Sequence, residues 1–393
     1  MTRWYRAPMS RAGAASHGDP VAYRPGLDGL RALAVTAVIL FHLGHLPGGN
    51  LGVDTFFVLS GWLITWKLLS EAERRSGRHP IDLRHFWAAR ARRLLPASLA
   101  VITAVAVVWT VAGIPVASLR RDVLFATFWS SNWGTITAGG DYWSHFGEPS
   151  PLTHFWSLAV EEQFYLFWPV VVWFLPAARR KSVFFWGIVG TMVLRTVLLW
   201  TGIQGTYGAR EYTFNRLDTL LLGALGALYV RDPEIRRQLK PVIDLVTKWW
   251  VMVPILFIGI LPNAKLDSLP DEFFGKITYG PGLTVISVLF LAYVLRSVDG
   301  TLGPRTKRFT EWRFNLVLGK YSYAIYLFHF AIATTLQPHA DTGKGLQVTG
   351  NAIIDSFIAC GLTTALSLAI ARVTWLAWEQ PWLRLKRRFS YRT

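Results

Sequence analysis

The sequence predicts an all-α protein, a polytopic integral membrane bundle of about ten spanning helices with one further segment that does not cross. Three observations predict this class. Of the 393 residues, 52% are hydrophobic and only 17% are charged, whereas soluble proteins carry about a quarter charged residues. The apolar residues form stretches of roughly 20, the length that crosses a bilayer as a helix. The basic residues lie in short clusters between these stretches.

The net charge of +17 does not indicate a nucleic acid partner. Lys and Arg lie next to apolar stretches, as in proteins that contact a lipid bilayer, so the bilayer is the partner we expect. The single cysteine, Cys360, excludes an intrachain disulfide and a multi-cysteine zinc site, and we expect no metal. Cys360 lies in a plain apolar run, which argues against a role as nucleophile.

The order of the elements follows from the apolar stretches. The segment 118–137 is doubtful as a span because two arginines open it and Ser, Asn and Gly interrupt it. The predicted spans are 27–46, 50–69, 94–114, 154–176, 182–203, 213–230, 242–262, 279–298, 315–336 and 352–378.

Charge decides how these spans are oriented. If 118–137 does not cross and the N-terminus is inside, 27 Lys and Arg fall in cytoplasmic connections and 6 in outer ones, as the positive-inside rule requires. We therefore expect both termini in the cytoplasm and 118–137 to be re-entrant or to lie at the outer face. Irregular backbone at membrane depth is tolerated where it lines a cavity, so 118–137 is a candidate cavity wall.

The expected organisation is a flexible cytoplasmic tail, a membrane domain and a basic cytoplasmic tail. These cover residues 1–26, 27–382 and 383–393. The first 25 residues are polar and contain no apolar core, so we do not expect a cleaved signal peptide. The protein is expected in the plasma membrane, with any chemistry inside the helix bundle.

Arg31 and His42 stand near opposite ends of the first apolar stretch, LRALAVTAVILFH. They are eleven residues apart, about three turns, so they share one face with roughly 16 Å between them. Arg31 near a span end can simply reach the interface, and a lone His can be a packing residue. The shared face instead indicates a cavity with a cation at the cytoplasmic end and an imidazole at the other.

Asp54 begins the second span, in the stretch GGNLGVDTFFVLSGWLIT, at a depth close to that of His42. A neutral imidazole can act as a base when a carboxylate orients it and stabilises its protonated form. Asp54 is therefore a candidate orienting group for His42, with helix capping as the alternative.

The cytoplasmic stretch HFWAARARRLLP, residues 85–96, carries Arg90 and Arg93 one helical turn apart. Its mixed apolar and basic faces are typical of interfacial helices, so lipid contact is one interpretation. The other is a phosphate clamp, because arginine forks match phosphate geometry.

The stretch THFWSLAVEEQFYLFWP, residues 153–169, places His154, Glu161 and Glu162 in or beside one apolar span. His154 and Glu161 are seven residues apart and share a helix face. Adjacent carboxylates in a span are costly, which favours a functional role. Further on, Asn215, Arg216 and Asp218 could pair with each other at the outer end, and His329 is open to a packing or a functional role.

These stretches, taken in order, resemble the membrane-bound acyltransferase family 3, the polysaccharide O-acetylases and their relatives. The resemblance covers residues 27 to 382. The pieces that carry it are LDGLRALAVTAVILFH, LGVDTFFVLSGWLIT, HFWAARARRLLP, FWSSNW, HFWSLAVEEQFYLFWP, LDTLLLGALGAL, GKYSYAIYLFHF and WEQPWLR.

The resemblance implies transfer of an acyl group, typically acetyl, from cytoplasmic acyl-CoA (acetyl-CoA) to a hydroxyl. The acceptor it implies is a cell-envelope glycan or glycolipid, with a small-molecule or macrolide acceptor as the alternative. The family's required Arg and His map to Arg31 and His42, its inner-loop arginine pair to Arg90 and Arg93, and its carboxylate to Glu161 beside Glu162. Many members carry an extra helix and an outer hydrolase-like domain, and we expect neither here.

Under this interpretation His42, oriented by Asp54 or Glu161, removes the proton of the acceptor hydroxyl, or becomes acylated itself. Arg31, Arg90 and Arg93 bind the phosphates of acyl-CoA. The groups expected to bind the acceptor or the oxyanion are His154, Asn132, Trp133, Arg216 and His329.

A proton-coupled transporter or flippase of a lipid-linked substrate is the hypothesis from another class. Intramembrane carboxylates and histidines suit proton coupling as well. No internal repeat is visible in the order of the stretches, which favours the enzyme.

Overall fold

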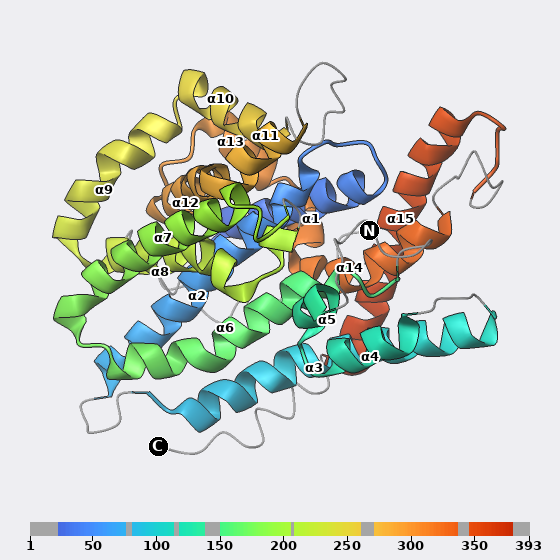
Figure 1. Cartoon of the computed structure of the whole chain (residues 1–393), viewed down its shortest axis with the longest axis horizontal. Helices are drawn as coiled ribbons and strands as arrows, with labels where there is room; N and C mark the ends of the chain where they lie inside the picture. Colours follow the sequence, from blue (N-terminus) through green and yellow to red (C-terminus); the bar gives the residue numbers. More distant parts are fainter. Residues whose placement is uncertain are drawn as a thin grey trace.

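The computed structural model describes residues 23–75, 81–113, 118–137, 150–205, 208–260, 271–336 and 346–379. Within them all regular structure is helical, which confirms the all-α bundle (Figure 1). The predicted tail 383–393 and most of the predicted tail 1–26 lie outside the described residues.

The long helices follow the predicted apolar stretches. They are α1 (Pro25–His42), α2 (Gly52–Arg74), α3 (Leu83–Val111), α6 (Phe155–Phe174), α7 (Ala177–Trp200), α8 (Leu217–Arg231), α9 (Pro233–Val246), α10 (Trp249–Ile260), α12 (Leu283–Asp299), α14 (Arg313–Leu336) and α15 (Ala352–Thr374). The short elements are η1 (Gly49–Leu51), α4 (Leu119–Thr127), α5 (Ser131–Thr137), η2 (Gly208–Arg210), η3 (Thr213–Arg216), α11 (Asp271–Ile277), η5 (Thr278–Gly282), α13 (Pro304–Thr310) and η6 (Trp375–Glu379).

By length and apolar composition, 6 helices of the described chain are able to cross a membrane, or 7 if the bent pair α9 and α10 forms one span. The chain is therefore a multi-pass membrane protein. The predicted spans fall on helices, 242–262 on the pair α9 and α10. Of the others, α2, α6 and α8 are not among the helices that qualify, and α8 has only 15 residues. The total of ten crossings stays a prediction.

Two boundaries differ from the prediction. The stretch 85–96 and the span 94–114 form one helix, α3, which continues through Pro96. With 29 residues it is about 43 Å long, longer than the ~30 Å hydrocarbon core, so its first turns extend beyond that core. The predicted span 242–262 is bent by 77° between α9 and α10.

The segment 118–137 forms two short helices of 9 and 7 residues, α4 and α5, rather than one helix long enough to span. They meet at Trp129, whose φ of 50° is the only positive value at a described non-glycine residue. The Gln163 side chain of α6 donates to the Trp129 carbonyl at 3.0 Å. This bond satisfies one backbone carbonyl at the break between the two short helices.

The helices α1 and α2 lie in the middle of the bundle, with α7 and α8 on one side and α14 and α15 on the other (Figure 1). Glycines allow the backbones to approach closely. A Cβ at Gly61 would collide with the Leu220 carbonyl oxygen, and one at Gly223 with the Val58 carbonyl oxygen. This small-residue contact fixes α2 against α8.

The pair α1 and α14 is fixed in the same way. A Cβ at Gly319 would collide with the backbone of Asp28. These two close pairs bring the polar faces of α1, α2 and α14 towards a common interior, where α3 and α6 complete the walls.

Candidate active site

A polar cavity, which we call the arginine cavity, has a volume of about 400 Å³ and is lined by α1, α2, α3, α6 and α14. The structure brings five predicted site residues together there from three helices, namely Arg31, Arg90, Arg93, Glu161 and Glu162. Two lysines that were not predicted, Lys67 and Lys320, line the same cavity. Basic side chains outnumber acidic ones on this lining, which suits an anionic ligand.

The arginines of this cavity have different surroundings. Arg31 forms an ion pair with Asp28 of the same helix, at 3.0 Å. The guanidinium carbon of Arg90 lies 3.7 Å from the ring centroid of Tyr165, a cation–π contact. Arg90 Nε is buried and has no hydrogen-bond partner among the described residues. The Arg90 guanidinium therefore has an N–H group that can donate to a ligand.

The two carboxylates of α6 also differ. Glu161 accepts hydrogen bonds from the hydroxyls of Ser60 and, at 3.2 Å, Tyr165. Glu162 is buried, and its Oε1 has no partner among the described residues. An unpartnered buried carboxylate oxygen is costly to maintain, which again marks this region as a candidate site.

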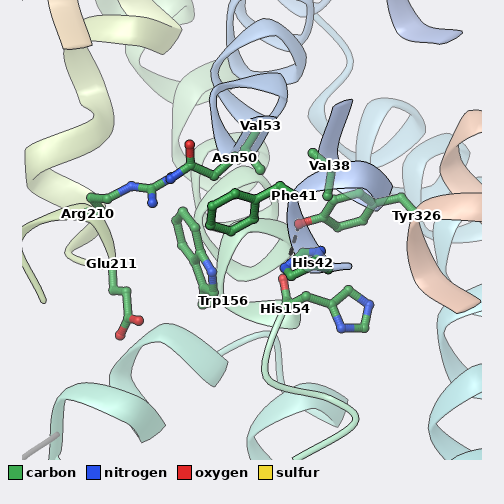
Figure 2. A pocket seen from close by; sticks show the side chains of 10 residues that line it. All are labelled: Val38, Phe41, His42, Asn50, Val53, His154, Trp156, Arg210, Glu211 and Tyr326. Atoms are coloured by element: carbon green, nitrogen blue, oxygen red, sulfur yellow. Dashed lines mark hydrogen bonds between the residues drawn. The ribbon is translucent and has the colours of Figure 1, made fainter. Parts of the chain in front are cut away.

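A second cavity, the histidine cavity, is smaller, about 30 Å³, and holds roughly one water molecule. Figure 2 shows Arg210 and Glu211 on one side of Trp156 and Phe41, and His42, His154 and Tyr326 on the other. Tyr326 and Val53 line both cavities, so the two meet between α2 and α14.

His42 meets another imidazole. Its Nδ1 lies 3.0 Å from Nε2 of His329, and the ring centroid of His154 lies 5.2 Å from that of His329. The remaining nitrogen of His329, Nδ1, lies 2.6 Å from the Tyr326 carbonyl oxygen.

With both rings neutral, this chain of contacts is consistent with one pair of tautomers. A carbonyl oxygen only accepts, so Nδ1 of His329 carries the proton and its Nε2 is the acceptor. His42 therefore donates through Nδ1, which leaves its Nε2 without a proton. The group that contacts the His42 ring is thus His329, an imidazole and not a carboxylate.

Asp54 does not have the predicted relation to His42. It forms an ion pair with Arg216, and both side chains are fully buried. The prediction that Asp54 orients His42 is corrected, because the Asp54 carboxylate pairs with Arg216 at the junction of η3 and α8. Arg216 lines neither cavity, and its guanidinium pairs with Asp54 through one nitrogen and lies over the Phe57 ring, so its predicted role in binding the acceptor stays a prediction.

The predicted pairing among Asn215, Arg216 and Asp218 is also wrong. Asp218 is held by Arg195 of α7, with two N···O distances of 2.9 Å. The Arg195 guanidinium also donates to the Gly280 carbonyl at 2.8 Å. These contacts tie α7, α8 and the π turn η5 together.

Asn132 and Trp133 line neither of the two cavities. Asn132 is fully buried and donates to the Glu211 carbonyl at 3.1 Å and to Thr213 Oγ1 at 2.9 Å. These two bonds join Asn132 to the segment that carries Arg210 and Glu211, and its predicted contact with an acceptor stays a prediction. Trp133 donates weakly to Gln163, at 3.4 Å.

The sequence interpretation missed Arg210, Glu211, Asn50, Trp156 and Tyr326, all on the histidine cavity. Arg210 lies 5.0 Å from the ring centroid of Tyr279 and 5.8 Å from that of Trp156. The available signal was that Arg210 is the single basic residue of the predicted outer connection after the span 182–203.

The Tyr326 hydroxyl closes the wall between the cavities. It lies 2.5 Å from Ser157 Oγ and donates to the His154 carbonyl at 3.3 Å, the bond drawn dashed in Figure 2. Among the described residues, no group of three or more His, Cys, Asp or Glu is arranged to hold a metal ion.

Comparison with known proteins identifies the family. The family model described as "Acyltransferase domain", acyltransferase 3, matches residues 24–372. The O-acetyltransferase OatA of Staphylococcus aureus strain NCTC 8325 / PS 47 is 36% identical over 338 residues, which cover 82% of this chain and 52% of that protein. The putative O-acetyltransferase SAS0844 of strain MSSA476 is 35% identical over 335 residues, with the same coverage.

The chain spans about half the length of the curated relatives it matches. No solved structure matches it. The family model nevertheless covers most of the chain, and the predicted first-span and EEQFY residues lie within it. The chain belongs to the acyltransferase 3 family of membrane proteins.

Proposed function

We propose that this protein is a membrane O-acyltransferase that moves an acyl group, acetyl in the first instance, from cytoplasmic acyl-CoA to an acceptor hydroxyl. The observation that carries the proposal is the arrangement of the two cavities. The arginine cavity, which is rich in basic residues, and the small histidine cavity, which is lined by His42, share Tyr326 and Val53 in their linings.

The donor would bind in the arginine cavity. Arg31, Arg90 and Arg93 provide forked donors for its phosphates. Arg31 and His42 lie eleven residues apart on α1, about 16 Å along the axis. An extended pantetheine arm covers such a span, so the thioester would reach the wall formed by Tyr326 and then His42.

The acyl transfer itself needs one proton to move. Nε2 of His42 takes the proton of the acceptor hydroxyl as its oxygen attacks the thioester carbonyl carbon. The C–O ester bond forms, the C–S bond breaks, and the thiolate of CoA leaves and is protonated. In the variant mechanism Nε2 attacks first, and an acyl-histidine then passes the group to the acceptor.

The acceptor side would be the far side of the histidine cavity. Arg210, Glu211 and Asn50 present polar groups beside the Trp156 ring, a combination suited to a hydroxylated ring with an apolar face. A cell-envelope glycan or glycolipid is the acceptor we propose, and a small molecule of the macrolide type is the alternative.

The test uses the full chain in proteoliposomes with acetyl-CoA labelled in the acetyl group. In the proteoliposomes we expect release of the CoA thiol. In a second measurement, mass spectrometry of cells with and without the protein should find an acetyl ester on envelope sugars only when the protein is present. Label that stays on CoA while a lipid-linked sugar crosses the bilayer would contradict the enzyme and favour a transporter.

A further inference from the structure

The arginine cavity has a feature that the proposed donor site does not use, an exposed lysine on its rim. Lys67 of α2 lines the cavity together with Arg90 and Arg93 of α3. Its Nζ lies 6.0 Å from the ring centroid of Phe86, on the facing turn of α3. Lys67 therefore faces the same helix that carries the arginine pair.

The depth of Lys67 follows from pairs of contacts between helices. Ser60 of α2 meets Glu161 of α6, and Thr65 meets Trp168, so the two helices run in the same direction. Lys67 is seven residues beyond Ser60, about 10 Å along the axis. Tyr165, against which Arg90 stacks, is four residues beyond Glu161, about 6 Å.

The same order appears on α3. Phe86, the neighbour of Lys67, is one turn before Arg90, about 6 Å along the helix. The basic groups are therefore arranged in two tiers, with Arg90 and Arg93 inside and Lys67 about one turn nearer the predicted cytoplasmic end.

Two tiers match the two phosphorylated positions of coenzyme A, the pyrophosphate and the ribose 3′-phosphate. Its pyrophosphate is next to the pantetheine arm, and its 3′-phosphate is one ribose further from the thioester. Lysine provides a compact, mobile charge at an exposed rim, whereas the arginine forks suit the more enclosed pyrophosphate.

The second rim lysine, Lys320, is directed elsewhere. Its Nζ lies 5.3 Å from the ring centroid of Tyr321 and 5.5 Å from that of Trp375, on the side of α14 and η6. Lys67 contacts a ring of α3, and Lys320 contacts rings of α14 and η6, so the two-tier order is argued for Lys67.

We propose that Lys67 binds the 3′-phosphate of the acyl-CoA donor and gives the enzyme its preference for CoA over 3′-dephospho-CoA. This inference rests on the proposed use of acyl-CoA.

The experiment measures the Kd of CoA and of 3′-dephospho-CoA by calorimetry, with the full chain in lipid nanodiscs. We expect wild type to bind CoA about tenfold more tightly, as for a charge-assisted contact. Lys67→Ala should bind both compounds equally, at the wild-type affinity for dephospho-CoA, and Lys67→Arg should restore the preference, which shows that the site is intact.

The control is Lys240→Ala. Lys240 is an exposed lysine of α9 that pairs with Asp244 at 2.7 Å and does not line the cavity, so this variant should keep the tenfold preference. A preference that survives in Lys67→Ala, or is absent from wild type, overturns the inference and leaves CoA binding standing. Wild type that binds neither compound overturns the proposed function as well.

Discussion

At the scale of single residues, the proposed chemistry depends on which nitrogen of His42 carries the proton. The chain from the Tyr326 carbonyl through His329 to His42 determines this with two contacts of 2.6 and 3.0 Å. A neutral imidazole that orients another imidazole adds no net charge in a region where ions are costly.

His329 is therefore predicted to be a positioning residue. His329→Leu removes the imidazole that contacts His42 Nδ1 and should lower kcat about 100-fold, within the range of general base catalysis, with little change in the KM for acyl-CoA. His329→Gln places an amide oxygen near the lost nitrogen and should recover part of kcat. Equal loss in both variants, or a loss confined to KM, would argue for a packing role.

The residues that sequence reasoning located are those whose chemistry conflicts with their apolar surroundings. Arg31, His42, Glu161 and Glu162 stand out for that reason, and the structure places all four on the two cavities. Arg210 and Asn50 lie in or beside polar connections, where an arginine or an asparagine is ordinary, so the sequence offered little to distinguish them.

At the scale of elements, periodicity shows which residues share a face of one helix but not which helix lies opposite. Asp54 and Arg216 are 162 positions apart, and nothing in the spacing of either predicts their ion pair. The 77° bend between α9 and α10 was missed for a related reason. Composition records apolar length, whereas the bend depends on the packing of both helices.

The pair Asp54–Arg216 joins α2 to the start of α8. Because both side chains are fully buried, Asp54→Asn should leave an uncompensated cation and lower the stability by about 3–5 kcal/mol. The double variant Asp54→Leu with Arg216→Met removes both charges and should recover most of that loss. Thermal unfolding in detergent measures the effect, and a double variant no better than the single one would refute this interpretation.

The close contact of α2 with α8 allows a sharper comparison of two glycines. Gly223→Leu must push α2 away, because even a Cβ at that position meets the Val58 carbonyl oxygen and the Trp62 backbone nitrogen. We expect this variant to lose its folded, monodisperse state. Gly190→Leu in α7 serves as the control, since a Cβ there meets nothing within 4 Å, and both are read by size-exclusion chromatography. Matching elution of the two variants would show that the contact does not fix the bundle.

At the scale of the whole molecule, two separate cavities share one wall. A donor that enters among basic residues and an acceptor that meets His42 from the other side would each approach the thioester carbon without entering the other's cavity. Under the further proposal, Lys67 binds the 3′-phosphate, which is the end of the donor farthest from the thioester. Under this proposal, either the acyl group or the thioester that carries it must cross from the arginine cavity to the histidine cavity beside Tyr326.

The position of the polar side chains inside the bundle was largely predictable, because the family resemblance and the energetic cost of polar residues in apolar helices agree. The partners of these side chains were not predictable. Asp54 was assigned to His42 because both lie at a similar depth, and depth alone does not show which side chains at that depth are in contact. The continuous helix α3 brings Arg90 and Arg93 to the cavity without a separate interfacial segment.

The central claim is that His42 performs the transfer from acyl-CoA, and a pair of histidines at the end of α1 tests it. In His42→Ala, acetyl-CoA-dependent acetylation by the full chain in proteoliposomes should fall by at least about 100-fold while the Kd for CoA is kept. His45→Ala is the matched control, because His45 contacts Ser356 at 3.0 Å and stacks on Phe357 outside both cavities, and it should retain wild-type activity. Full activity in His42→Ala, or equal loss in both variants, would contradict the account.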